Sequence, residues 1–142
     1  MYNVAIVTSK FNEEITGKLY QGAIELLNKH ADQIENHDDF WVPGAVELPL
    51  FAQRLAQTKK YNAILVLGAV IYGETDHYDY VCQQVSFGCQ KVALDNNIPV
   101  IFGVLTCRTD EQALDRVGGK HGNKGYDCAQ ALVDTLKELE KI

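Results

Sequence analysis

The sequence lacks any apolar run close to the roughly 20 residues that span a bilayer. Its first residues, MYNVAIVTSKFN, also lack the basic and apolar zones of a signal peptide. Positive charge is scarce, because 13 Lys and Arg stand against 19 Asp and Glu, a net charge of −6. A phosphate backbone needs a basic stripe on its partner. We therefore expect a cytoplasmic protein that binds neither membrane nor nucleic acid.

Metal and redox motifs are missing as well. The four cysteines form no C-x-x-C pair, which argues against a zinc ribbon or a thioredoxin-like site. They are expected to be reduced packing residues. The four histidines have no H-E-x-x-H or similar ligand spacing. His37 with Asp38 and Asp39 is one conceivable metal site, but a polar entrance to a strand is the better interpretation.

Three common catalytic motifs are also absent. No G-x-G-x-x-G follows the first apolar segment, and there is no G-x-S-x-G elbow. The stretch from Arg116 to Gly125 is basic and rich in glycine, yet it lacks the G-x-x-x-x-G-K-[ST] spacing of a nucleotide loop. It is predicted to be a turn between two helices with glycine caps. Such a turn leaves Arg116 and Lys124 free to meet an anion.

What is present is typical of one globular domain. With 142 residues, 46% hydrophobic and 23% charged, the chain has the size and composition of a single domain over residues 1–142. Short apolar segments, most of them nearly continuous, predict strands that are buried on both faces. These segments are Asn3 to Thr8, Asp39 to Val42, Ala63 to Leu67 and Val100 to Leu105.

Helical patterns lie between and after these segments. Apolar residues recur every three or four positions, as in amphipathic helices. The expected helices cover about 15–27, a segment after Pro43-Gly44 with Pro49 in its first turn, about 76–95, about 111–117, and a last helix with Cys128, Leu132, Leu136 and Leu139 facing inward. This order predicts a flavodoxin-like three-layer α/β/α sandwich around a four-stranded parallel sheet. Ligands of such sheets bind beyond the carboxyl ends of the strands.

The segment from Gly68 to His77 follows one of these strands and enters a helix. Free amides at a helix start form a site for an anion. Thr75 can cap that helix or bind a phosphate, and His77 can move protons beside it. The alternative is a capped helix with a surface histidine, which the local sequence by itself favours.

Two other turns offer binding groups. In the turn at Pro43-Gly44, Glu47 can bind hydroxyl groups of a substrate, or it can simply complement the helix dipole. Phe11 can stack on a planar heterocycle, although an aromatic residue at such a place is more often part of the core.

Taken together, five blocks resemble the 6,7-dimethyl-8-ribityllumazine synthase family in order and spacing. The similarity covers essentially the whole chain. The blocks are Lys10-Phe11-Asn12, VPGAVELP from Val42 to Pro49, GAVIYGETDHYDYV from Gly68 to Val81, PVIFGVLTCRTDEQALDR from Pro99 to Arg116, and GKHGNKG from Gly119 to Gly125.

The resemblance implies a transferase of riboflavin biosynthesis that uses no metal or cofactor. Members of the family join 5-amino-6-(D-ribitylamino)uracil to 3,4-dihydroxy-2-butanone 4-phosphate and release phosphate and water. By resemblance, His77 shuttles protons. The residues that the resemblance assigns to the pyrimidine and ribityl chain are Phe11, Ala45, Val46, Glu47, Ala69, Val70, Ile71 and, from a neighbouring subunit, Phe102. Those that it assigns to the phosphate are Glu74, Thr75, Arg116 and Lys124.

The resemblance also implies that the chain binds copies of itself. A homopentamer is expected ahead of a sixty-subunit cage, because the chain starts almost at its first strand, where many members carry an extension that pairs with a neighbour. Riboflavin synthase is a further candidate partner. Two positions depart from the family pattern, because Val46 replaces an aromatic residue and Tyr72 replaces an arginine. The alternatives are a non-catalytic flavin or lumazine binder and a structural shell protein on the same scaffold.

Overall fold

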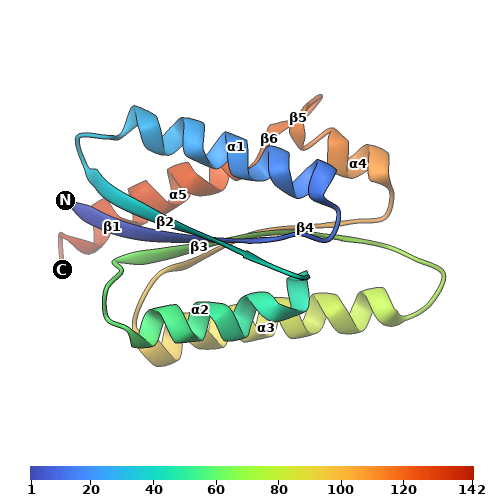
Figure 1. Cartoon of the computed structure of the whole chain (residues 1–142), viewed down its shortest axis with the longest axis horizontal. Helices are drawn as coiled ribbons and strands as arrows, with labels where there is room; N and C mark the ends of the chain where they lie inside the picture. The colour runs from blue at the N-terminus through green and yellow to red at the C-terminus, as the bar shows by residue number, and fades with distance from the viewer.

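The computed structural model describes residues 1–142 and has a parallel sheet between two layers of helices (Figure 1). Its strands run in the order β2-β1-β3-β4, and every neighbouring pair is parallel. The strands are β1 (Tyr2–Ser9), β2 (Ile34–Val42), β3 (Ala63–Ile71) and β4 (Val100–Cys107). The helices are α1 (Glu13–Lys29), α2 (Leu48–Gln57), α3 (His77–Asn96), α4 (Asp110–Leu114) and α5 (Lys124–Leu139), with a 3-10 turn at Ala45–Glu47. The predicted flavodoxin-like sandwich is confirmed.

Two hydrophobic cores hold the layers together. α1 and α5 cover one face of the sheet, and α2 and α3 cover the other (Figure 1). β3 is one of the two inner strands, and all its residues are buried except the last, Ile71, which is half-buried. Its side chains enter the two cores in alternation. Gly125 lets α5 approach α1 closely, since a Cβ at this position would overlap the backbone carbonyl of Leu19.

β2 is longer than the sequence pattern predicts, because it begins at Ile34 and not at Asp39. As an edge strand, it can carry polar side chains that reach solvent. Tyr61 donates a hydrogen bond to Asp38, and Tyr20 donates one to Asp39, both at 2.6 Å. His37 Nδ1 lies 2.9 Å from Asp39 Oδ1. Within the chain, no group of three His, Cys, Asp or Glu side chains is placed to hold a metal ion.

Two predictions for the last third of the chain are wrong. The short helix α4 ends at Leu114, and the segment after it is not a turn between helices but a hairpin of β5 (Val117–Gly119) and β6 (Gly122–Asn123). Gly118 and Gly122 have φ angles of 112° and 76°, which allow the chain to reverse this sharply. Leu139 does not face inward, because α5 ends there and its last turn lies in solvent.

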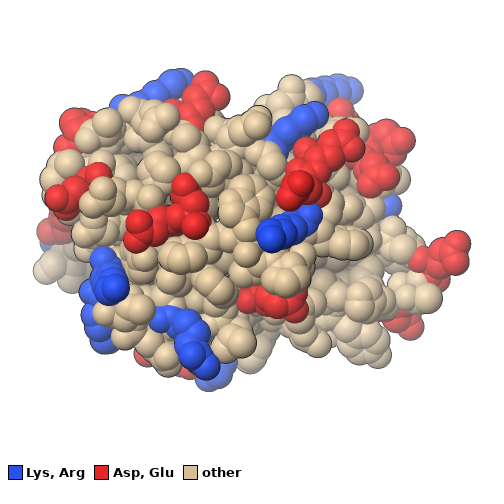
Figure 2. Space-filling model, in the orientation of Figure 1, with Lys and Arg blue, Asp and Glu red and all other residues tan.

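The carboxyl ends of all four strands lie at the side of the sheet opposite the two chain termini (Figure 1). No helix combines the length and the apolarity needed to cross a bilayer. On the face drawn in Figure 2, acidic and basic side chains are interspersed and form no continuous basic stripe.

Candidate active site

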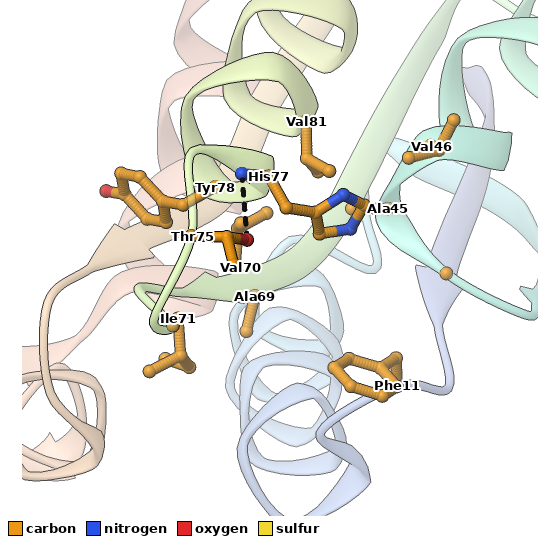
Figure 3. A pocket seen from close by; sticks show the side chains of 12 residues that line it. Phe11, Ala45, Val46, Ala69, Val70, Ile71, Thr75, His77, Tyr78 and Val81 are labelled. Atoms are coloured by element: carbon orange, nitrogen blue, oxygen red, sulfur yellow. Dashed lines mark hydrogen bonds between the residues drawn. The ribbon is translucent and has the colours of Figure 1, made fainter.

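A cavity of about 360 Å³ opens at the carboxyl ends of β1 and β3 (Figure 3). Its walls are mostly apolar and come from four segments that are distant in sequence. They are the turn after β1, the turn after β2, the last residues of β3 with the loop that follows it, and the start of α3. The sheet therefore brings together the segments that sequence analysis selects, because parallel strands end at one edge.

Phe11 forms one wall of this cavity, and it is not a core residue. Its side chain is 68% exposed, an unfavourable position for a phenyl ring without a ligand or partner. The backbone holds it in place, since the Phe11 amide donates to the carbonyl of Pro43 at 3.0 Å and Lys10 donates to Val42 at 2.8 Å. Asn12, with a φ of 63°, then turns the chain into α1. The ring thus presents a face to the cavity on a rigid backbone.

The turn after β2 forms the opposite wall. Ala45 is buried, and Val46 is 40% exposed at the cavity. The Glu47 carboxylate accepts a hydrogen bond of 2.8 Å from the Gly44 amide, and the Glu47 amide donates to the Gly44 carbonyl at 3.2 Å, so two bonds close the turn. Both expected roles of Glu47 stay open, because the carboxylate has a second oxygen and is exposed. Glu47 itself does not line the cavity.

The third wall combines the end of β3 with the start of α3. Ala69, Val70 and Ile71 line the floor, and His77 is the first residue of the helix. Figure 3 shows the His77 imidazole between this floor and the turn at Ala45. Asp76, not Thr75, is the N-cap residue, but the Thr75 hydroxyl accepts a hydrogen bond of 3.3 Å from the His77 amide. A titratable ring thus faces the cavity from a helix N-terminus.

Arg116 and Lys124 lie in a different cavity, of about 400 Å³, against the end of β4. The hairpin links them, since the Lys124 amide donates to the Arg116 carbonyl at 2.7 Å. The Arg116 guanidinium donates to the Gln112 carbonyl at 2.8 Å. Burial raises the pKa of the Cys107 thiol in this cavity, while the nearby charge of Arg116 lowers it. The second cavity therefore carries two permanent positive charges, Arg116 and Lys124, against one carboxylate, Asp127, and its excess of positive charge favours an anion.

The single chain does not bring every predicted residue together. The two cavities share no residue, and Phe102 and Glu74 line neither of them. Phe102 is half-buried on β4 and packs against the core on the side of α2 and α3. Within one chain, the predicted residues therefore lie in separate places.

Four residues of the first cavity are absent from the predicted set: Gly44, Gly73, Tyr78 and Val81. Tyr78 and Val81 lie in the helix expected over about 76–95, but the sequence assigns them no binding role. Their spacing contains a usable signal, because Val81 lies four positions after His77 and thus on the same helical face. The two glycines have no side chain whose chemistry could indicate a binding role.

Residues 1–140 match the sequence model of the 6,7-dimethyl-8-ribityllumazine synthase family. The chain is 55% identical over 141 residues to proteins named 6,7-dimethyl-8-ribityllumazine synthase from the Nine Mile phase I and Dugway strains of Coxiella burnetii. Each alignment covers 99% of this chain and 93% of the relative. Their similarity extends through both cavities and the sheet between them. On this evidence, the chain belongs to the 6,7-dimethyl-8-ribityllumazine synthase family.

Proposed function

We propose that the two cavities are the two halves of the active site of a 6,7-dimethyl-8-ribityllumazine synthase in riboflavin biosynthesis, each half completed by a neighbouring copy of the chain. Family membership carries the activity itself. One observation carries the assignment of the site: an exposed phenyl ring, a helix N-terminus and a histidine converge on one cavity at the carboxyl end of the sheet.

The first cavity suits 5-amino-6-(D-ribitylamino)uracil. Its pyrimidine ring is flat and can stack on Phe11, while backbone groups of Ala45 and Val46 meet its polar edge. Glu47 lies beside this turn and can accept hydrogen bonds from ribityl hydroxyls. The floor from Ala69 to Ile71 supplies the apolar contact below the ring.

The second cavity suits the phosphate of 3,4-dihydroxy-2-butanone 4-phosphate. Arg116 offers a planar, permanently charged donor set, and Lys124 adds a second positive charge. The amides of Glu74 and Thr75 precede α3 and approach the same phosphate from the side of the first cavity. Binding from two sides places the ketone of one substrate next to the amine of the other.

The chemistry then needs little more than placement and proton transfer. The amine attacks the ketone, and a first water leaves to form an imine. Elimination of phosphate then gives an enol that tautomerises to a second ketone, and the ribitylamino nitrogen closes the ring on this ketone with loss of a second water. Holding both reactants removes the entropy of their encounter. His77 serves as general acid and base in these steps, and Arg116 stabilises the departing phosphate.

The assembly we propose is a homopentamer, in which Phe102 and the second cavity of one subunit complete the first cavity of the next. A head-to-tail contact of this kind closes into a ring when its rotation fits. The outer face of α3 supports such a contact, because Tyr80, Phe87 and Leu94 follow one another at intervals of seven residues and are 64%, 73% and 70% exposed.

We further propose that residues 1–142 act as one domain in the cytoplasm. All four cysteines are free thiols in the structure, as is usual in a reducing compartment. Riboflavin synthase, which would take up the product, is the second partner that we propose.

The decisive experiment mixes the purified protein with both substrates and follows formation of the lumazine by absorbance. We expect product formation well above the uncatalysed rate. A rate equal to the uncatalysed one, from folded protein in an assembled state, would refute the proposed activity.

A further inference from the structure

Three side chains form a continuous stack next to the first cavity. The Arg108 guanidinium lies over the ring of Tyr72, with 4.8 Å from its Cζ to the ring centroid. The Tyr72 ring in turn meets the ring of Tyr78 edge to face, at 5.4 Å between centroids and 65° between planes. Both geometries are attractive, since a cation favours the face of an aromatic ring and a second ring favours an edge contact.

The stack connects two segments that leave the sheet in different directions. Tyr72 directly follows β3, and its amide donates to the carbonyl of Cys107 at 2.9 Å. Arg108 directly follows β4, and its amide donates to the side-chain oxygen of Gln112 at 2.8 Å. Arg108 therefore has a fixed backbone from which it holds Tyr72.

The loop between Tyr72 and His77 has few other attachments. Gly73 and Glu74 take part in no hydrogen bond within the chain, and Thr75 makes only the bond to the His77 amide. A segment with so few contacts is held mainly at its ends. The end at Tyr72 is fixed by the sheet and by Arg108, and the end at α3 is fixed by the contact between Tyr78 and Tyr72.

Tyr78 and His77 are neighbours in the first turn of α3 and point to opposite sides of it. Figure 3 shows the His77 ring toward Ala45 and the Tyr78 ring on the far side. Burial is the largest influence on Tyr78 and raises the pKa of its hydroxyl, while the charge of Arg108 lowers it. Tyr78 and His77 share this turn, so a contact that holds the Tyr78 ring also restrains the backbone that carries His77.

We infer that Arg108 is a positioning residue, which acts through Tyr72 and Tyr78 to hold the first turn of α3 so that the His77 imidazole faces the substrates. This inference rests on the proposed function. Arg108 itself lines neither cavity. Its effect should thus appear in the chemical step and not in binding.

The test compares Arg108→Leu, Arg108→Lys, Tyr72→Leu and Tyr72→Phe in steady-state kinetics with both substrates. Loss of the stack should lower kcat about three- to tenfold in Arg108→Leu and Tyr72→Leu, with KM for either substrate unchanged. Arg108→Lys keeps the cation and Tyr72→Phe keeps the ring face, so both should retain most of kcat. Arg54→Leu removes another exposed arginine, on α2, and should match the wild type.

A double-mutant cycle with His77→Ala separates positioning from general loosening. If Arg108 acts through His77, adding Arg108→Leu to His77→Ala should cause no further loss of kcat. A further loss equal to that in the wild-type background would overturn the inference, as would a rise in KM for the butanone phosphate, which would mean direct contact with the phosphate. If Arg108→Leu does not fold, the comparison of Tyr72→Phe with Tyr72→Leu tests the same stack.

The two proposals fail in different ways. A wild-type protein that forms no product refutes the proposed activity, whatever the variants do. An active wild type with Arg108→Leu and Tyr72→Leu at full kcat refutes only the positioning role.

Discussion

The two cavities at the carboxyl end of the sheet are built from different chemistry. The first is mostly apolar, with the exposed ring of Phe11 and the imidazole of His77 as its distinctive groups. The second contains Arg116, His121 and Lys124 against the end of β4. One fits a flat, neutral ring and the other fits an anion.

Under the proposed function, each cavity supplies only part of what the reaction needs. A site for two substrates needs a flat apolar surface and a cluster of positive charge, and placing both in one small pocket would leave the charge partly desolvated. A chain that carries them on separate surfaces, sharing no residue, can join them by contact with a second copy. If this division holds, variants of the two cavities should affect the two substrates differently.

The largest effect is expected from mixing two inactive variants. Phe11→Asp removes the stacking ring of the first cavity, and Arg116→Ala removes the guanidinium of the second. Each parent should be nearly inactive at limiting butanone phosphate. After dissociation and random reassembly at equal amounts, about a quarter of the contacts in a closed ring join two intact halves. We therefore expect about a quarter of wild-type activity, measured after subunit exchange has been verified by mass spectrometry. Exchange without recovery would contradict a shared site.

Arg116→Ala by itself should affect the two substrates unequally. Loss of a charged hydrogen-bond donor costs about 1.5–3 kcal/mol, so kcat/KM for the butanone phosphate should fall about 10- to 150-fold. Binding of the pyrimidine, measured by titration, should change little. The matched control is Arg54→Ala, which removes an exposed arginine on α2 that lines neither cavity. Equal losses for both substrates would show that the second cavity is not specific for phosphate.

His77→Ala should lower kcat about ten- to hundredfold and leave residual turnover, because proximity survives the loss of the proton shuttle. Single-turnover kinetics measure the chemical step directly. Complete inactivity in a folded, assembled variant would mean that His77 has a more essential role. An unchanged kcat would mean that the first cavity contributes only binding.

Glu47 variants should give the smallest effect, with a substrate preference opposite to that of Arg116. Removal of its carboxylate in Glu47→Ala should raise KM for the pyrimidine about five- to tenfold, by loss of about one hydrogen bond and a looser turn at Gly44. Glu47→Gln keeps an oxygen acceptor and should lie between Glu47→Ala and the wild type. An increase in KM for the butanone phosphate would contradict the assignment of Glu47 to the pyrimidine.

Sequence patterns predict the layers of this fold well, because strands that are buried on both faces are nearly continuous apolar runs. The apolar runs at Ala63 and Val100 lie within β3 and β4, and the strand at Asn3 lies within β1. β2 is truncated in the prediction, since the polar residues from Glu35 to Asp39 do not look like a strand. They are tolerated there because β2 is an edge strand with tyrosine partners, and its place in the sheet depends on tertiary pairing.

The candidate site, like the fold, is predicted only in part by the sequence. The segments after the strands can be selected from the chain order, and Phe11, Ala45 and His77 do converge on one cavity. The alternative of a core position for Phe11 is wrong, and its exposure follows only from the turn that the carbonyl of Pro43 fixes. The stack of Arg108 on Tyr72 has no sequence signal, because the two residues are 36 positions apart and meet only through the pairing of β3 with β4.

The sequence predicts the buried strands, their parallel arrangement and the family, because these depend on local apolar patterns and on motifs along the chain. The hairpin at Gly118 and Gly122, the exposure of Phe11 and the separation of the two cavities follow only from the packed structure. The physical reason is that exposure and distance between side chains are properties of packed elements. A pattern of residues along one element does not contain the positions of the others.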